Sequence, residues 1–232
     1  MRILATTTKW AFMLSLPVLL LTASIGGAFN SLWLYKYGFA RYEISRSTGL
    51  AVTELDKAAR GLISYFNSAE ESISLTVVKD SQPFALFNQR EIIHLSDVKA
   101  LVWLDYQLLL GTLIYASGYV GISLLWRRKR YWRRLARGVV GGSSLTLALM
   151  LALGSGTLLG FDQLFLQFHW LSFANDFWQL DPTRDYLVML FPRGFWYDAT
   201  LFITLATAGT AIIFGGVAGG YLLKLRVSRD LS

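Results

Sequence analysis

Four long apolar segments without a charged residue constrain the fold of this 232-residue chain more than any other feature. A helix needs about 20 apolar residues to cross the hydrocarbon core of a bilayer. A charge at the centre of such a helix costs about 2.5–3.5 kcal/mol, so uncharged runs of this length are informative. The predicted spans are residues 10–35, 106–126, 139–160 and 199–223. We therefore expect a mainly α-helical, polytopic membrane protein with a bundle of four transmembrane helices.

Positive charge concentrated on one side of these spans predicts the orientation of the chain. The loop between the second and third spans, residues 127–138, carries seven basic side chains and no acidic one, and such loops stay in the cytoplasm. Both termini then lie in the cytoplasm, with residues 1–35 forming the N-terminus and first span and residues 224–232 the tail. The net charge of +7 is thus a topology signal. It indicates contact with membrane lipid and no role in binding nucleic acid.

The first apolar run also has to be distinguished from a cleaved signal peptide. It continues to Tyr35 and is longer than the apolar core of a signal peptide, which has about 7–15 residues. We therefore expect a retained membrane anchor.

Two segments remain outside the predicted spans, on the side opposite the basic loop. Residues 36–105 are long enough to form a small α+β extracytoplasmic cap. Residues 161–198 are rich in aromatic side chains but interrupted by polar ones. We expect this second extracytoplasmic segment to lie in the membrane interface or to pack beneath the cap.

Local patterns predict a few elements within the cap. Apolar residues at helical spacing indicate a helix over residues 53–66, which Thr53 and Asp56 would begin as a capping box. Short strands are expected at residues 73–78 and 84–87, on either side of a turn.

Several classes of chemistry are excluded by the sequence. The chain has no cysteine, which excludes disulfides, thiolate metal sites and cysteine nucleophiles. The sequence also lacks the serine-hydrolase elbow, the HExxH pattern and the P-loop. No predicted span carries an ionisable residue at its centre, which argues against a transporter.

The two histidines of the chain are the strongest candidates for chemistry. His94 lies just before the second span, whose helix we expect Ser96 or Asp97 to cap, and His169 lies just after the third. Both are therefore expected at the same membrane surface. Imidazole titrates near neutral pH and suits general acid–base catalysis, although a single histidine among aromatic rings is more often structural. A zinc site is the alternative. Its further ligands would come from Asp97, Asp162, Asp176 or Asp185.

Around these histidines the sequence resembles the lipoprotein intramolecular transacylase family, Lit. Before the second span the resemblance is carried by Glu91, His94, Asp97, Val98 and Lys99. After the third span it is carried by Phe165, His169, Phe173, Asn175, Trp178, Leu180, Pro182, Asp185, Phe191, Pro192, Phe195 and Trp196. The four-span layout with an extracytoplasmic cap is also similar, so the resemblance extends over most of the chain.

The resemblance implies a multi-pass enzyme of the bacterial plasma (inner) membrane, with its site at the outer leaflet and no metal or cofactor. Its partners would be bacterial lipoproteins whose N-terminal cysteine carries a diacylglyceryl thioether and a free α-amine. The enzyme would move the sn-2 acyl chain from glycerol to that amine and so produce lyso-form lipoprotein. The catalytic pair of the family falls on His94 and His169.

The residues around the histidines suit this acyl transfer. We expect His169 to accept the proton of the amine and His94 to act as the acid or as an orienting partner, with the reverse assignment also open. Glu91 or Asp97 would fix a histidine tautomer. An aromatic pocket would orient the headgroup and exclude water. Its expected members are Phe165, Phe168, Trp170, Phe173 and Trp178. The further candidates for oxyanion or substrate binding and for support are Asn175, Arg184, Lys99 and Asp185.

Two other functions remain open from the sequence. A metal-dependent membrane hydrolase would bind zinc and lose activity with a chelator. A non-catalytic membrane sensor or scaffold would keep its activity when either histidine is replaced by alanine.

Overall fold

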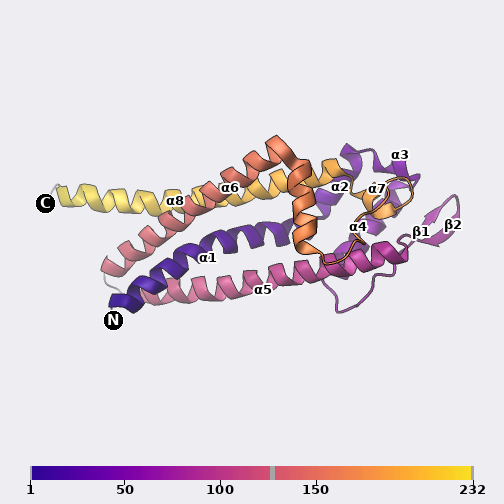
Figure 1. The fold of residues 1–232 in the computed structure, drawn as a ribbon. Coiled ribbons are helices and arrows are strands. Elements are labelled where there is room, and N and C mark those ends of the chain that lie inside the picture. The colour runs from indigo at the N-terminus through magenta and orange to yellow at the C-terminus, as the bar shows by residue number, and fades with distance from the viewer. Residues whose placement is uncertain (1, 126–128, 231–232) are drawn as a thin grey trace. The chain divides into compact units, whose positions relative to one another are not determined.

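The structure is a computed structural model that describes residues 2–125 and 129–230 (Figure 1). The described chain is mainly helical, with one short β-hairpin. Four of its helices are long and apolar enough to cross a membrane, which confirms the number predicted from the sequence. They are α1 (Arg2–Phe29), α5 (Gln89–Leu125), α6 (Lys129–Ser172) and α8 (Arg193–Asp230).

The chain forms two compact units, which are described separately. Unit 1 comprises residues 1–25, 105–155 and 202–232, and unit 2 comprises residues 26–104 and 156–201. Each of the four long helices contributes one part to each unit. Both histidines belong to unit 2.

Unit 1 is built from close helix–helix contacts. Phe12 of α1 stacks on Tyr119 of α5, with the ring centroids 4.4 Å apart. On α6, a Cβ atom at Gly142 would lie 2.5 Å from the Leu16 side chain and 3.0 Å from the Met13 carbonyl oxygen of α1. Glycine therefore allows α1 and α6 to approach each other, as small residues commonly do between membrane helices.

Unit 2 contains the shorter elements. They are α2 (Leu32–Arg41), α3 (Ile44–Thr48), α4 (Val52–Phe66), β1 (Thr76–Lys79), β2 (Gln82–Ala85) and α7 (Tyr186–Leu190). The predicted cap helix is confirmed as α4, but its capping box is wrong. The helix begins after Ala51 without a side-chain cap, and Thr53 lies inside its first turn.

The predicted hairpin is also confirmed, with both strands displaced from their predicted bounds. The strands pair antiparallel, with Thr76 opposite Ala85 and Lys79 opposite Gln82. Asp80 and Ser81 form the connecting turn with φ angles of 51° and 62°. Positive φ at both central residues gives a turn whose twist matches that of the paired strands.

The apolar run that we expected to continue through Tyr35 is split in the structure. Asn30 donates its side-chain amide to the Gly26 carbonyl oxygen at 2.8 Å, at the end of α1. Ser31 then accepts a hydrogen bond from the Leu34 amide and caps α2. These side chains satisfy helix-end groups that would otherwise lack partners, so one helix ends and another begins.

The other long helices extend beyond their apolar runs. α5 begins well before the predicted span at residues 106–126, and α6 continues through the first part of the aromatic segment. α6 also includes residues 129–138 of the predicted basic loop, whereas residues 127–128 lie outside the described residues. Hydropathy marks the part of a helix that suits lipid, and polar residues extend the helix past it.

A break at Gly160 separates the apolar part of α6 from the part that carries His169. Gly160 has φ −163° and ψ 50° inside an otherwise helical stretch. Apart from its chain neighbours and the backbone of its own helix, no atom of the described residues lies within 4 Å of the position that a Cβ atom would take at Gly160. A residue without a side chain is a common place for such a kink.

The start of α8 packs closely on α2. A Cβ at Gly38 would lie 2.3 Å from the Phe195 ring, so this contact requires glycine. Tyr42 donates its hydroxyl to an Asp198 carboxylate oxygen at 2.7 Å. Burial raises the pKa of Tyr42 to about 12, and the hydrogen bond and charge of Asp198 contribute to the increase. The Tyr42 hydroxyl therefore stays protonated as the donor to Asp198 at neutral pH.

Candidate active site

The position of His94 depends on where α5 begins. Asn88 Oδ1 accepts hydrogen bonds from the Arg90 and Glu91 amides at 3.0 and 3.2 Å. Glu91 Oε2 accepts one in return from the Asn88 amide at 2.7 Å. This reciprocal capping box starts the helix one turn before His94. The expectation of a cap at Ser96 or Asp97 is wrong, because both lie inside α5.

Two buried carboxylates connect the start of α5 to the segment around α7. Glu91 Oε1 accepts a hydrogen bond from the Leu187 amide at 2.6 Å. Asp185 accepts one from the Asn88 side-chain amide at 2.9 Å and one from the Asp181 amide at 2.7 Å. Only 1% of Glu91 and 2% of Asp185 is exposed, and buried carboxylates need such partners. Glu91 accepts hydrogen bonds from the Asn88 and Leu187 backbone amides, which differs from the tautomer-fixing role we expected.

The two histidines meet in unit 2 although they are distant in the chain. His94 projects from α5 and His169 from the last turns of α6, with the ring centroids 6.2 Å apart and the ring planes inclined by 29°. Each residue is only 7% exposed. Two groups that can donate and accept protons therefore lie next to each other in a buried region.

Aromatic rings surround this pair. The centroid of His169 lies 4.2 Å from that of Phe165 and 5.0 Å from that of Trp178. Phe173 contacts both histidines, at 4.9 Å from His94 and 5.5 Å from His169. Phe168 meets His169 edge-on at 5.4 Å.

The fifth expected member of the aromatic pocket points elsewhere. Trp170 is 65% exposed. It follows His169 directly in α6, and successive residues of a helix point in directions about 100° apart. The aromatic wall therefore consists of Phe165, Phe168, Phe173 and Trp178, without Trp170.

Hydrogen bonding distinguishes the two imidazoles. His169 Nδ1 lies 2.7 Å from the Phe165 carbonyl oxygen. A carbonyl oxygen only accepts, so Nδ1 carries the proton and, in the neutral ring, Nε2 holds the free lone pair. His94 Nδ1 is buried and has no hydrogen-bond partner within residues 2–125 and 129–230.

The loop after α6 is fixed to α5 by polar contacts next to the histidines. Asn175 donates its side-chain amide to Asp97 Oδ2 at 2.9 Å, and its Oδ1 accepts from the Phe177 amide at 3.1 Å. Arg90 donates to the Asp176 carbonyl oxygen at 2.6 Å. We did not select Arg90 from the sequence, where its only signal is a position one turn before His94 on the same face of a helix.

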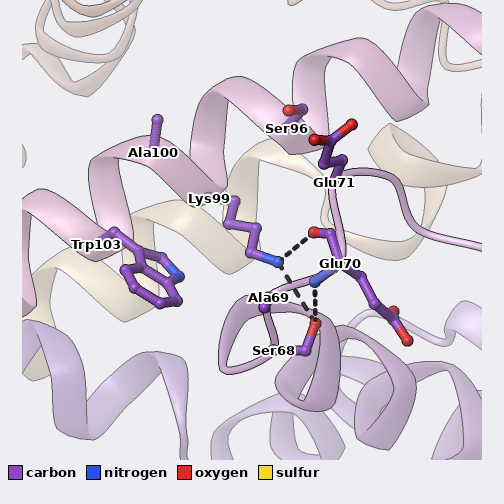
Figure 2. A pocket seen from close by; sticks show the side chains of 8 residues that line it. All are labelled: Ser68, Ala69, Glu70, Glu71, Ser96, Lys99, Ala100 and Trp103. Carbon is purple, nitrogen blue, oxygen red and sulfur yellow. Dashed lines mark hydrogen bonds between the residues drawn. The ribbon is translucent and has the colours of Figure 1, made fainter.

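Two other sequence candidates are directed away from the pair. Lys99 donates to the Glu70 carbonyl oxygen at 2.6 Å and lies over the Tyr65 ring, with its ammonium 4.2 Å from the centroid. Figure 2 shows its side chain extending to the segment after α4. The Arg184 side chain is 70% exposed and pairs with Asp181 and Asp185. Hydrogen bonds from the Thr183 amide and hydroxyl lower the pKa of Asp181.

The zinc ligands considered from the sequence do not assemble among the described residues. No group of three histidine, aspartate or glutamate side chains in this part of the chain is arranged to hold a metal ion. Asp162 instead accepts a hydrogen bond from Arg193 at 2.7 Å. The geometry at the histidines is that of a pair of imidazoles within aromatic walls.

Comparisons with known proteins show which family and relatives this chain is similar to. A family model described as "Lipoprotein intramolecular transacylase Lit" matches residues 10–196. A curated protein of Aquifex aeolicus, named only as an uncharacterized protein, is 28% identical over 140 residues. That match covers 60% of this chain and 60% of the Aquifex protein, so it spans less than two thirds of that relative.

Solved structures match the whole fold. The in meso structure of the membrane integral lipoprotein intramolecular transacylase Lit from Bacillus cereus has a TM-score of 0.80, with 21% identity and 100% coverage of both chains. Two structures of that protein with one histidine replaced, by arginine or by alanine, match with a TM-score of 0.75 over 96% of this chain and 94% and 95% of theirs. Together with its four apolar helices, this similarity identifies the chain as a multi-pass membrane protein.

Proposed function

The chain belongs to the lipoprotein intramolecular transacylase family, a family of acyl-transferring enzymes, and from this premise we propose the reaction that it performs. The substrate is a lipoprotein whose N-terminal cysteine carries a diacylglyceryl thioether and a free α-amine. The enzyme moves the sn-2 acyl chain from the glyceryl oxygen to that amine. The product is N-acylated lyso-form lipoprotein.

One observation carries this proposal. The only two histidines of the chain lie with their ring centroids 6.2 Å apart, both buried, between two helices of the same unit. The reaction needs one proton removed from an amine and one delivered to an alkoxide, and two imidazoles supply both. Because amine and ester belong to one substrate molecule, the reaction needs no covalent acyl-enzyme, in agreement with the absence of cysteine.

The hydrogen bonds suggest a role for each histidine. His169 Nε2 takes the proton of the α-amine while the amine nitrogen attacks the sn-2 ester carbon and forms a tetrahedral intermediate. The carbon–oxygen bond to glycerol then breaks, and the departing oxygen takes a proton from His94. The Phe165 carbonyl oxygen holds His169 Nδ1 and so keeps Nε2 directed to the substrate. The proton that His169 takes from the amine passes to His94, directly or through water, before His94 delivers it to the glyceryl oxygen.

The aromatic wall contributes orientation and dryness. The diacylglyceryl headgroup is flexible. Confining it so that amine and ester meet lowers the activation free energy by up to about 7–11 kcal/mol. Phe165, Phe173 and Trp178 surround His169 at centroid distances of 4.2–5.5 Å. Excluding water from this place prevents hydrolysis of the ester.

The polar residues near the pair act as positioning residues. The bond between Asn175 and Asp97 holds the loop that carries Trp178 against α5. Glu91 and Asp185 fix the start of α5 and the segment around α7. In this proposal they set the separation of the two imidazoles without touching the reacting atoms.

Mass spectrometry of a diacylated lipoprotein incubated with the purified protein tests the proposal. We expect the total mass to stay constant while one acyl chain moves to the N-terminal fragment and one glyceryl hydroxyl becomes free. Release of free fatty acid with a loss of mass would indicate a hydrolase and contradict intramolecular transfer. An unchanged lipoprotein in the presence of folded enzyme would contradict the proposal as well.

We also propose that the site faces the outer leaflet of the bacterial plasma membrane and that both termini are cytoplasmic. The absence of cysteine makes single-cysteine labelling clean. A membrane-impermeant maleimide added to intact spheroplasts is expected to label Ser47→Cys in α3 and to leave Lys224→Cys in the tail unlabelled until lysis. The reverse pattern would contradict this orientation.

A further inference from the structure

A groove in unit 2 lies beside a face of α5 that the histidines do not use. It is open, with a volume of about 570 Å³, and lies between α5 and the segment that follows α4 (Figure 2). Lys99 is five residues after His94, a separation that turns its side chain about 140° around the helix axis. The groove is therefore a place separate from the histidine pair.

The groove presents groups of opposite charge in a fixed order along α5. Trp103, Lys99 and Ser96 follow one another on the helix, with Glu71 opposite Ser96 (Figure 2). The uncharged stretch of α5 begins at Tyr106, three residues after Trp103, with Leu104 and Asp105 between them. Among the residues that line the groove, the order from the apolar end outward is an indole, an ammonium group and a carboxylate.

The indole and the ammonium group are held in place by backbone oxygens. Trp103 Nε1 donates to the Phe66 carbonyl oxygen at 3.0 Å, and the side chain is still 44% exposed. Lys99 Nζ donates to the Glu70 carbonyl oxygen at 2.6 Å and to Ser68 Oγ at 3.4 Å. The same ammonium group lies over the Tyr65 ring, so a bound phosphate would meet Lys99 chiefly through its positive charge.

We propose that this groove binds the headgroup of a zwitterionic, phosphoethanolamine-type phospholipid, with its phosphate at Lys99, its ammonium group at Glu71 and its glycerol end beside Trp103. In such a lipid the order from the acyl chains outward is glycerol, phosphate, ammonium. The groove repeats that order with complementary charges. Tryptophan at the glycerol level agrees with the general preference of indole rings for the membrane interface.

The charges favour this occupant over two others. An anionic phospholipid without an ammonium group would bring its phosphate to Lys99 but would leave Glu70 and Glu71 to repel it. The lipoprotein substrate carries a thioether-linked diacylglycerol, which has no phosphate to pair with Lys99. The groove thus serves a membrane lipid and goes beyond the acyl-transfer reaction.

Counting retained lipids by native mass spectrometry tests the proposal without measuring acyl transfer. The full chain is purified from mixed micelles that contain equal amounts of phosphatidylethanolamine and phosphatidylglycerol. We expect wild-type protein to retain phosphatidylethanolamine preferentially. Glu71→Gln is expected to lower that preference about tenfold, the scale of one lost charge-assisted contact. Lys99→Gln is expected to lower the retention of both lipids by about the same factor, because both carry a phosphate. Glu71→Gln changes an exposed side chain, so it reports even where Lys99→Gln impairs folding.

Matched controls come from the exposed ion pair of Arg46 and Glu43, whose side chains are also in unit 2. Arg46→Gln and Glu43→Gln change the same charges and are expected to leave the lipid preference as in wild type. Equal retention of both lipids by wild type, or an unchanged preference in Glu71→Gln, would overturn the proposal. If Lys99→Gln and Glu71→Gln retain both lipids as wild type does but bind a lipopeptide substrate more weakly, the groove belongs to the substrate peptide. That result would also overturn the proposal.

Discussion

Unit 1 and unit 2 satisfy their buried polar groups in different ways. In unit 1, the hydroxyls of Thr22, Thr146 and Thr207 each donate to a carbonyl oxygen one turn earlier in their own helix. In unit 2, Glu91 binds the Leu187 amide, and Asn88 binds Asp185, across 96 and 97 positions of the chain. These buried hydroxyls of unit 1 are thus satisfied within single helices, whereas these buried carboxylates of unit 2 are satisfied only when distant segments meet.

This difference indicates where precision matters for function. Locally satisfied hydroxyls remain satisfied when helices shift slightly against each other, so unit 1 tolerates small rearrangements. Long-range bonds to buried carboxylates are lost when either segment moves, and their loss is costly. The histidine pair lies in the unit whose geometry is held by such bonds. Changes in unit 2 should therefore affect catalysis, and changes in unit 1 should affect stability.

The largest expected effect is on the histidine pair itself. His169→Ala removes the base and should lower the acyl-transfer rate about 10²–10⁴-fold, the usual contribution of general acid–base catalysis. Trp170→Ala is the matched control, because Trp170 is the neighbour of His169 in α6 and its own side chain is 65% exposed. Rates of N-acylation by mass spectrometry distinguish them. Similar rates for the two variants would remove the distinction between the pocket and the exposed face of α6.

Loss of a long-range carboxylate should reduce both stability and rate. Glu91→Ala leaves the Asn88 and Leu187 amides without their acceptor, and each unsatisfied buried group costs about 1–3 kcal/mol. The midpoint temperature of thermal unfolding in detergent and the acyl-transfer rate should both decrease. Glu43→Ala, at an exposed glutamate of the same unit, should change neither. Wild-type stability of Glu91→Ala would mean that unit 2 does not depend on these bonds.

A change in unit 1 should separate stability from catalysis. Gly142→Ala places a methyl group 2.5 Å from Leu16 and 3.0 Å from a backbone oxygen, and such overpacking costs about 1–3 kcal/mol. Gly118→Ala has open space around it and should stabilise α5 by about 0.5–1 kcal/mol. The rate per folded molecule should be unchanged in both. A specific loss of catalysis in Gly142→Ala would contradict the separation of roles.

The smallest expected effect concerns the contact between the loop after α6 and α5. Asn175→Ala breaks one partly exposed hydrogen bond to Asp97, which is worth about 0.5–1.5 kcal/mol and corresponds to a loss of rate of about 2–10-fold. A double-mutant cycle with Asp97→Ala measures the coupling. Additive effects of the two substitutions would show that this bond does not position the loop.

The membrane helices and the cap helix were predictable because their signals are local. Hydropathy identifies the four spans, and the spacing of Leu55, Ala59, Leu62 and Phe66 identifies α4. His94 and His169 could be selected as candidates from their number and position. The short distance between the two imidazole rings depends on the tertiary structure, and the predicted topology only suggested it.

The features that the sequence did not reveal depend on distant partners or on backbone geometry. Asn88 and Glu91 form a capping box, yet the pattern competes with Ser96 and Asp97 as equally good helix starts. Glu91 finds its second partner at Leu187, which no local pattern indicates. The non-helical backbone at Gly160 precedes the His169 segment, although glycine alone does not predict a kink. The exposure of Trp170 could not be predicted, because the sequence does not give the rotational phase of α6 after Gly160.

Acyl-transfer rates of His94→Gln, His169→Gln and the double variant measure whether the two imidazoles act as one proton-transfer unit. Groups that act together are strongly non-additive. We therefore predict that each single variant loses activity about 10²-fold or more and that the double variant is no slower than the slower single one. A single variant with nearly wild-type rate, or a double variant whose loss is the product of the two single losses, would contradict a shared role.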